Sequence, residues 1–301
     1  MSDGILNVLK PPGMTSHDVV SRIRRICHSK KVGHSGTLDP DAAGVLPVFL
    51  GNATRLLESA VNGTKCYRAE AVLGIRTDTG DDSGSILEHK PAPELSEEQI
   101  KTVLESFRGK IWQTPPMYSA LKHNGKKLYE YARQGIEIDR QPRPVEIFRL
   151  ELIRFYAPYF CLDIECSKGT YIRTLLEDIA AALGTCACMT FLLRTRAGDF
   201  RIEDAYTLEE IENNPEEALL PMETAVAWIP VLPVNELQAF RITNGVKTTM
   251  HGVPEGMYRL YFQEQFLGMV KVEEEIVSPL KIICQTKRPE QAETVGTLIQ
   301  P

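Results

Sequence analysis

The sequence predicts an α+β protein in which a mixed α/β domain over residues 1–229 is followed by a small β-rich domain over residues 230–286. Strand-like and helix-like segments alternate along the first domain. The prolines of "WIPVLPV" then mark a boundary at residues 228–234, and the apolar pattern of "YRLYFQEQFLGMVKV" is typical of strands. The 301 residues exceed one typical domain of about 100 to 200 residues. Residues 287–301 show little periodicity, so we expect a terminal tail there.

Three stretches of the first domain have the character of β-strands. "ILNVL" near the N-terminus is a short apolar run, and "CYRAEAVLG" follows the Asn62-Gly63 pair, which favours a tight turn. "YFCLDIEC" alternates apolar and polar residues, as a strand with one buried face does. We therefore expect strands in all three places.

Four stretches predict helices. "SHDVVSRIRRICHSK" has Ser16 as a candidate N-cap, and "SEEQIKTVLESFRG" opens with the capping box Ser96-x-x-Gln99 and closes on Gly109. "GTYIRTLLEDIAAALG" ends at Gly184, and "TLEEIEN" is a short acidic helix. The apolar face of the first helix is formed by Val19, Val20, Ile23, Ile26 and Cys27.

The charge is unevenly distributed along the chain. The net charge of -6 argues against a nucleic-acid partner, because phosphate binding normally requires a basic surface. Residues 10–34, however, hold six basic residues against Asp18 alone, and residues 108–154 hold ten basic against five acidic residues. Residues 203–236 carry nine acidic residues and no basic one. Any one charge run could be a solvated face, but two basic segments together favour an anionic substrate.

Several functional classes are disfavoured. No window approaches the roughly 18 uncharged apolar residues of a membrane span, and the N-terminus lacks the pattern of a signal peptide, so we expect a soluble cytoplasmic protein. The seven cysteines do not resemble a disulfide framework, and Cys186 and Cys188 are better explained as buried thiols than as zinc ligands. Walker A, G-x-G-x-x-G and H-E-x-x-H motifs are absent.

Asp39 stands out in the stretch "KVGHSGTLDPDAAGVLPVFL", which is almost free of other charge. Before a proline it could be a simple turn residue, because aspartate accepts local backbone hydrogen bonds. Its context favours chemistry. "GHSGTLDPDAAGVLPVFLGNATR", "KCYRAEAVLGIRTDTGDDSG", "PPMYSALKHNGKKLYEYARQG" and "SKGTYIRTL" together resemble the TruB family of bacterial tRNA pseudouridine synthases. The resemblance covers roughly residues 4 to 200 with several ordered motifs.

The resemblance implies a fold and a reaction. The fold would be a catalytic domain built around a large, mainly antiparallel sheet, followed by a small PUA-like domain that touches the acceptor stem of tRNA. The reaction would isomerise the T-loop uridine at position 55 of tRNA to pseudouridine, with no metal and no cofactor. No protein partner would be obligatory, and the enzyme would act as a monomer.

The resemblance also implies catalytic residues. Asp39 matches the essential aspartate, which as a carboxylate can attack C6 of uracil or C1′ of ribose. Arg173 matches the arginine that pairs with it, and a nearby guanidinium lowers a carboxylate pKa by roughly 1 to 3 units. Tyr67 matches the tyrosine that stacks on the target base and can move a proton at the sugar. Singly, the arginine would be interpreted as a surface cation and the tyrosine as core packing.

Further matches suggest residues that bind the RNA. Tyr171 and Leu192 match pocket residues beside the flipped nucleotide, and Asp81 matches a polar residue near it, although a turn carboxylate is the simpler interpretation. His34 matches the residue that fills the space left by the flipped base. Lys10 is expected to order the neighbourhood of the site or to contact RNA.

Residues 115–143 match an insertion that closes over the T loop. Its expected phosphate-binding residues are Lys122, Lys126, Lys127, Arg133, Arg140 and Arg143, and its tyrosines Tyr118, Tyr129 and Tyr131 could pack on RNA or on each other. Two alternatives stay open. The chain could be a pseudouridine synthase with another RNA target, or an RNA-binding protein without catalysis in which Asp39 is only a turn residue.

Overall fold

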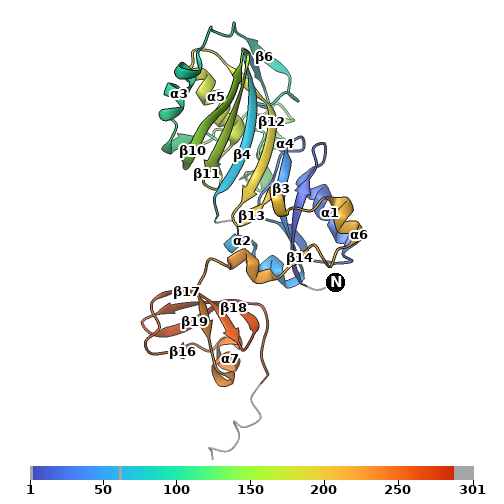
Figure 1. The fold of residues 1–301 in the computed structure, drawn as a ribbon, viewed down its shortest axis with the longest axis vertical. Helices are drawn as coiled ribbons and strands as arrows, with labels where there is room; N and C mark the ends of the chain where they lie inside the picture. The colour runs from blue at the N-terminus through green and yellow to red at the C-terminus, as the bar shows by residue number, and fades with distance from the viewer. Residues whose placement is uncertain (1–2, 61–62, 288–301) are drawn as a thin grey trace, which may run out of the picture.

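The computed structural model describes residues 3–60 and 63–287 and has two parts (Figure 1). A large domain contains a long, twisted sheet with helices against it, and a small β-rich domain follows it along the longest axis of the molecule. The fold is α+β, as the sequence predicts. None of the helices within the described ranges combines the length and the apolar character that crossing a bilayer requires.

One ten-stranded sheet organises the large domain. Its main path runs in the order β14 (Leu219–Leu220), β1 (Gly4–Lys10), β3 (Ala43–Leu50), β12 (Ala187–Ala197), β4 (Lys65–Leu73), β11 (Tyr159–Cys166), β10 (Arg143–Tyr156) and β7 (Gly109–Gln113). Off this path, β2 (Val32–His34) pairs with β3, and β13 (Phe200–Arg201) pairs with β12. The three predicted strands correspond to β1, β4 and β11.

The sheet is antiparallel except at its centre. There β3 and β12 run parallel, with Ala43 opposite Leu193 and Gly44 opposite Arg194. The parallel pair joins a half that contains β1 and β3 to a half that contains β12, β4, β11, β10 and β7. Residues 35–42, which connect β2 to β3 and include Asp39, therefore lie at the junction of the two halves.

Each half of the sheet has its own helices and core. Helices α3 (Glu97–Glu105) and α5 (Ile172–Ala182) pack on the larger half, where Leu104 and Ile179 join Phe160 in one apolar cluster. Helices α1 (Ser16–Ile26) and α6 (Leu208–Asn213) pack on the smaller half, where Ile23 and Ile211 lie in another. Apolar residues at helical spacing make these contacts possible, because they gather on one face of each helix.

Two predicted helix ends are wrong in detail. The N-cap of α1 is Thr15, which forms a capping box with Asp18, whereas Ser16 is the first helical residue. Both positions carry a hydroxyl, so sequence alone could not separate them. Helix α3 ends at Glu105 with Ser106 as its cap, and Gly109 begins β7. Gly184 does end α5, in the left-handed conformation (φ 82°) that favours glycine.

The small domain is a five-stranded sheet with a helix. Its strands are ordered β15 (Val231–Pro233), β17 (Gly256–Phe262), β18 (Gln265–Glu273), β19 (Ile276–Ile282) and β16 (Thr248–Thr249). Helix α7 (Glu236–Thr243), which we did not predict, packs on this sheet. Phe266 and Met269 of β18 share an apolar cluster with Ile5 and Phe49 of the large domain, so the two domains are packed together.

Shorter elements connect these parts. They are η1 (Gly51–Leu56), α2 (Leu57–Ala60), β5 (Ile75–Thr77), β6 (Ile86–His89), β8 (Lys122–His123), β9 (Lys126–Lys127), α4 (Leu128–Ala132), η2 (Ile202–Asp204) and η3 (Met222–Val226). The insertion at residues 115–143 contains the β8–β9 hairpin and α4. Asn124 and Gly125 both have positive φ at the hairpin tip, as expected for an Asn-Gly turn. The predicted tail lies outside the described residues from residue 288 onward.

Candidate active site

Lys10 anchors the loop that carries Asp39. It ends β1, and its ammonium donates to the carbonyls of Pro11 (2.8 Å), Pro40 (2.8 Å) and Ala42 (2.7 Å). The residue is completely buried, and burial lowers its pKa to about 8. All three N–H groups are occupied, so the ammonium has none left to donate to an RNA phosphate. Its other expected role, ordering the site, agrees with these contacts.

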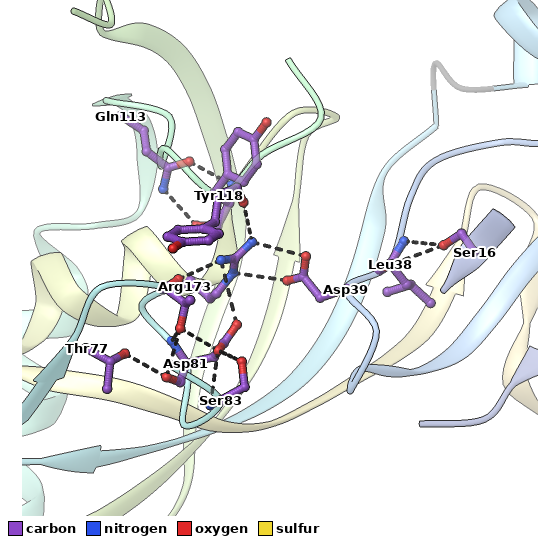
Figure 2. Close-up of polar contacts among 11 residues, drawn as sticks. Ser16, Leu38, Asp39, Thr77, Asp81, Ser83, Gln113, Tyr118 and Arg173 are labelled. Carbon is purple, nitrogen blue, oxygen red and sulfur yellow. Dashed lines mark hydrogen bonds and ion pairs between the residues drawn. The ribbon is translucent and has the colours of Figure 1, made fainter. Parts of the chain in front are cut away.

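Arg194 anchors the same loop from β12, and the sequence analysis missed it. Its guanidinium, also completely buried, donates to the carbonyls of Val45 (2.7 Å) and Gly36 (3.1 Å). Ser16 holds the loop from a third side, since its hydroxyl accepts from Leu38 N–H (2.9 Å) and donates to Leu38 C=O (3.1 Å) (Figure 2). A basic residue within the apolar strand "FLLRTRA" was the available signal for Arg194, because a buried charge must have partners.

Asp39 and Arg173 form a two-pronged ion pair. Arg173 Nε lies 3.0 Å from Asp39 Oδ2, and Nη2 donates to Oδ1 at 3.1 Å (Figure 2). Arg173 belongs to the first turn of α5, 134 residues along the chain. The side chain of Arg173 is 5% exposed and that of Asp39 is 34% exposed, so the carboxylate keeps an open side. Two parallel contacts fix the orientation of a carboxylate as well as its charge.

Arg173 is itself held by the backbone. Its Nη1 donates to Thr79 C=O (2.6 Å), and its Nη2 donates to Tyr118 C=O (2.9 Å). The guanidinium therefore has little freedom to move. Because Tyr118 lies at the start of the insertion, one buried arginine joins the loop that carries Asp39, α5 and the insertion.

Asp81 contacts Arg173 through a nitrogen that does not bind Asp39. Its Oδ2 lies 3.7 Å from Arg173 Nη1, while its Oδ1 accepts from the hydroxyls of Thr79 (2.7 Å) and Ser83 (2.6 Å). The side chain is thus both a turn carboxylate and a second neighbour of Arg173. It is not among the residues that line the pocket described below.

The pKa of Asp39 is raised, contrary to our expectation. Burial by the surrounding protein is the largest cause, Arg173 opposes it, and the negative charge of Asp81 raises the pKa further. The guanidinium does not outweigh burial, because desolvation of the carboxylate is the larger effect and the charge of Asp81 adds to it. The free site therefore holds a carboxylate that is more basic than an ordinary aspartate.

Asp39 faces a pocket of about 290 Å³. Its lining includes Lys65, Tyr67, Tyr118, Tyr171, Arg173 and Leu192. Aromatic walls around a few convergent polar groups are typical of a site for a small planar group. The pocket brings together five predicted residues, namely Asp39, Tyr67, Tyr171, Arg173 and Leu192.

The two predicted pocket tyrosines differ in their setting. Tyr67 lies on β4, is 8% exposed, and has a raised pKa because it is buried. Tyr171 precedes α5, where its backbone N–H donates to Gln113 Oε1 (2.7 Å) and its carbonyl accepts from Gln113 Nε2 (3.0 Å). Gln113 is nearly fully buried. It fixes the backbone of Tyr171, a role that sequence analysis did not anticipate.

His34 lies on β2 and is not among the lining residues. Its Nδ1 atom is buried without a hydrogen-bond partner, and burial lowers its pKa. The imidazole is therefore neutral at physiological pH. This fits a shape-filling role better than a role as a proton donor.

The basic residues of the insertion fall into two groups. Arg140 and Arg143 are tied to the protein: Arg140 Nη1 donates to Pro115 C=O (3.2 Å), and the Arg143 guanidinium lies 5.1 Å from the centre of the Tyr171 ring. Lys122 and Lys126 are exposed on the β8–β9 hairpin. Lys127 and Arg133 both lie 5.4 Å from the centre of the Tyr129 ring.

Within residues 3–60 and 63–287, no three His, Cys, Asp or Glu side chains lie close enough together to bind one metal ion. All seven cysteines are free thiols, and Cys186 and Cys188 are buried, as predicted.

Two known protein families match consecutive parts of the chain. Residues 24–172 match "TruB family pseudouridylate synthase (N terminal domain)", and residues 173–227 match "tRNA pseudouridylate synthase B C-terminal domain". The first match contains Asp39, Tyr67 and the insertion, and the second begins at Arg173.

Individual proteins extend the comparison over nearly the whole chain. A tRNA pseudouridine synthase B of Caldanaerobacter subterraneus is 47% identical over 93% of this chain and 99% of its own length. A protein of the same name from Haemophilus influenzae is 40% identical over 94% of this chain and 96% of its own. Among solved structures, a chain of a Cbf5-Nop10-Gar1 complex has a TM-score of 0.72 and 27% identity, and the match covers 94% of this chain and 85% of that chain.

Proposed function

Because the chain belongs to the TruB family of pseudouridylate synthases, we propose that it isomerises the T-loop uridine at position 55 of tRNA to pseudouridine. The observation that carries the proposal is the ion pair of Asp39 and Arg173, which presents a carboxylate to a pocket lined by Tyr67. Relatives at 40–49% identity are named for tRNA, whereas the relatives of known structure in H/ACA assemblies are only 25–27% identical. This difference favours tRNA over a guide-dependent target.

Asp39 is the nucleophile in this proposal. The reaction breaks the bond between C1′ and N1, forms a bond between C1′ and C5, releases the proton of C5 and adds one to N1. A carboxylate can support this exchange by adding to C6 of uracil or to C1′ of ribose, and both routes stay open. Arg173 binds both carboxylate oxygens, so it fixes the direction from which Asp39 approaches the nucleotide.

Tyr67 supports the base and handles a proton. Its ring forms one wall of the pocket, where it can stack on uracil. Because burial raises its pKa, the hydroxyl stays protonated and is available as a donor at the sugar. Leu192 and Tyr171 complete the apolar lining that takes up the flipped base.

The target base must leave its stack before it can enter this pocket, at a cost of a few kcal/mol. His34 is the group that we assign to the space the base leaves, because a neutral ring can fill that space without placing a charge there. Lys122, Lys126, Lys127 and Arg133 of the insertion are assigned to RNA phosphates. Binding of this kind weakens steeply with salt.

The domain arrangement follows from this assignment. Residues 1–229 form the catalytic domain with its RNA-clamping insertion at residues 115–143, and residues 230–286 form a PUA-like domain for the acceptor stem. We propose that the chain acts as a monomer and needs no protein partner. Seven free thiols accord with the reducing cytoplasm.

Tritium release tests the proposed activity. A T-loop hairpin RNA labelled with tritium at C5 of the target uridine should lose its label with the wild type, because bond formation at C5 expels that hydrogen. A wild type that binds the hairpin but releases no tritium would leave only a binding function.

A further inference from the structure

Lys65 places an ammonium in the pocket beside the catalytic tyrosine. It is the first residue of β4, two positions before Tyr67. Residues two apart on a strand point to the same face, and both side chains line the pocket. The sequence analysis did not single out Lys65, although the spacing in "KCY" was visible.

The ammonium of Lys65 has no partner among the described residues, since none of their hydrogen bonds or ion pairs involves it. It is nevertheless largely enclosed, and burial lowers its pKa to about 8, with the neighbouring cations Arg194 and Lys168 adding to the effect. An enclosed charge without a partner is costly. An anion that arrives with the substrate would therefore stabilise the charged form of Lys65.

The pocket lining carries both signs of charge. Its one acidic residue is Asp39, which is paired with Arg173. Lys65 belongs to the same lining, and Arg194, but not Asp39, is among the charges that shift the pKa of Lys65. The N–H groups of Arg194 point at backbone carbonyls, so Lys65 is the basic residue of this lining whose ammonium is open to an anion.

Gly36 leaves room for the Lys65 ammonium. A Cβ at this position would lie 3.3 Å from Lys65 Nζ, and the backbone there has φ of +105°, which side chains other than glycine rarely adopt. The carbonyl of Gly36 accepts from Arg194 instead of Lys65. The loop of residues 35–42 therefore passes close to Lys65 without accepting a hydrogen bond from its ammonium.

We propose that Lys65 binds a phosphodiester adjacent to the flipped uridine. The inference rests on the proposed function, under which the pocket receives a nucleotide with an uncharged base and anionic phosphates. In this arrangement the base lies against Asp39 and Tyr67 and an adjacent phosphate meets the Lys65 ammonium, because all three side chains line one pocket.

A double-mutant cycle between protein and RNA tests the contact. The binding parent is Asp39→Asn, which allows affinity to be measured without turnover, and the hairpin carries a neutral methylphosphonate either 5′ or 3′ of the target uridine. At one of these positions the methylphosphonate should weaken binding to the parent about tenfold, as expected for loss of a charged hydrogen bond. Binding to Asp39→Asn with Lys65→Met should not weaken further at that position.

Matched controls make the result specific. Lys110→Met in the same parent removes an exposed lysine of β7 outside the pocket, and should keep the full methylphosphonate penalty. Lys65→Gln repeats the cycle with a polar side chain, in case Lys65→Met folds poorly. In otherwise wild-type protein, Lys65→Met should raise KM, and Lys65→Arg should keep KM close to the wild-type value.

Two results would overturn the inference. One is an equal methylphosphonate penalty with and without Lys65, and the other is no penalty at either position in the parent. Tritium release by the wild type on the unmodified hairpin keeps these failures apart from a failure of the proposed function, because release would establish turnover whatever Lys65 does. Without release, the inference falls with the function on which it rests.

Discussion

The pocket and the insertion both use positive charge, but in opposite ways. Arg173, Arg194 and Lys10 in and around the pocket are buried, and each makes several hydrogen bonds that hold it in one place. Lys122 and Lys126 on the insertion are exposed on the β8–β9 hairpin, whose strands are two residues long. Under the proposed function, the buried cations position the reacting group, whereas the exposed ones can adapt to the backbone of a folded RNA.

This contrast predicts that pocket substitutions reduce turnover and insertion substitutions reduce affinity. The largest effect is expected for Asp39→Asn, which removes the carboxylate that we propose as the nucleophile and keeps the shape of the side chain. Tritium release should fall by about three orders of magnitude or more. Hairpin binding, measured by filter retention, should stay within about twofold of the wild type. Residual turnover near the wild-type rate would show that Asp39 is only a turn residue.

Arg173→Lys keeps the charge of the guanidinium but loses its two-pronged geometry. Misplacement of a reacting group by about 1 Å can cost roughly 100-fold in rate, and we expect kcat to fall by about that factor. Thermal unfolding of the variant is the control, since Arg173 also binds two backbone carbonyls. An unchanged kcat would mean that the orientation of Asp39 does not limit turnover.

Lys10→Met separates anchoring from RNA contact. Loss of three hydrogen bonds to carbonyls should lower the free energy of unfolding by about 1 to 3 kcal/mol and reduce kcat. The slope of log affinity against log salt concentration should not change, because a buried ammonium with three partners reaches no phosphate. A shallower slope would restore the RNA-contact role that the structure argues against.

Lys126→Ala probes the other side of the contrast. It should weaken hairpin binding a few-fold. The slope of log affinity against log salt concentration should become shallower by about 1, as expected for the loss of one phosphate contact, while single-turnover rates at saturating enzyme stay unchanged. Lys110→Ala, an exposed lysine outside the insertion, is the matched control. A reduced single-turnover rate would place the insertion in the chemistry itself.

Asp81→Asn should have the smallest effect. The pKa of Asp39 is raised in part by Asp81, so removing that charge lowers the Asp39 pKa. Activity falls on acidification as Asp39 becomes protonated. In the variant this fall should therefore occur at a lower pH than in the wild type. The pH profile of kcat/KM measures this shift. A shift to higher pH would contradict the assigned coupling.

Much of the site could be predicted because its residues lie in motifs with a recognisable order, and Asp39, Tyr67 and Arg173 meet although 134 residues separate the first from the last. Lys10 and Arg194 show what could not be predicted. Their partners are backbone carbonyls of a loop that is distant in sequence, so the sequence left two roles open for Lys10 and gave no role to Arg194. Helix α7 was missed although its capping box, Asn235 with Gln238, is visible in the sequence. The net pKa shift of Asp39 needed the structure, since it depends on how burial, Arg173 and Asp81 balance.

The position of Asp39 at the junction of the two half-sheets has a consequence for how the enzyme inactivates. The loop is held by Lys10 from one half and Arg194 from the other, across the only parallel strand pair in the described part of the large sheet. Any opening that separates the halves must break the centre of the domain, so the site cannot come apart through a small local fluctuation. Amide hydrogens of β3 should therefore exchange among the slowest in the chain, and heat should abolish activity only where the whole domain melts.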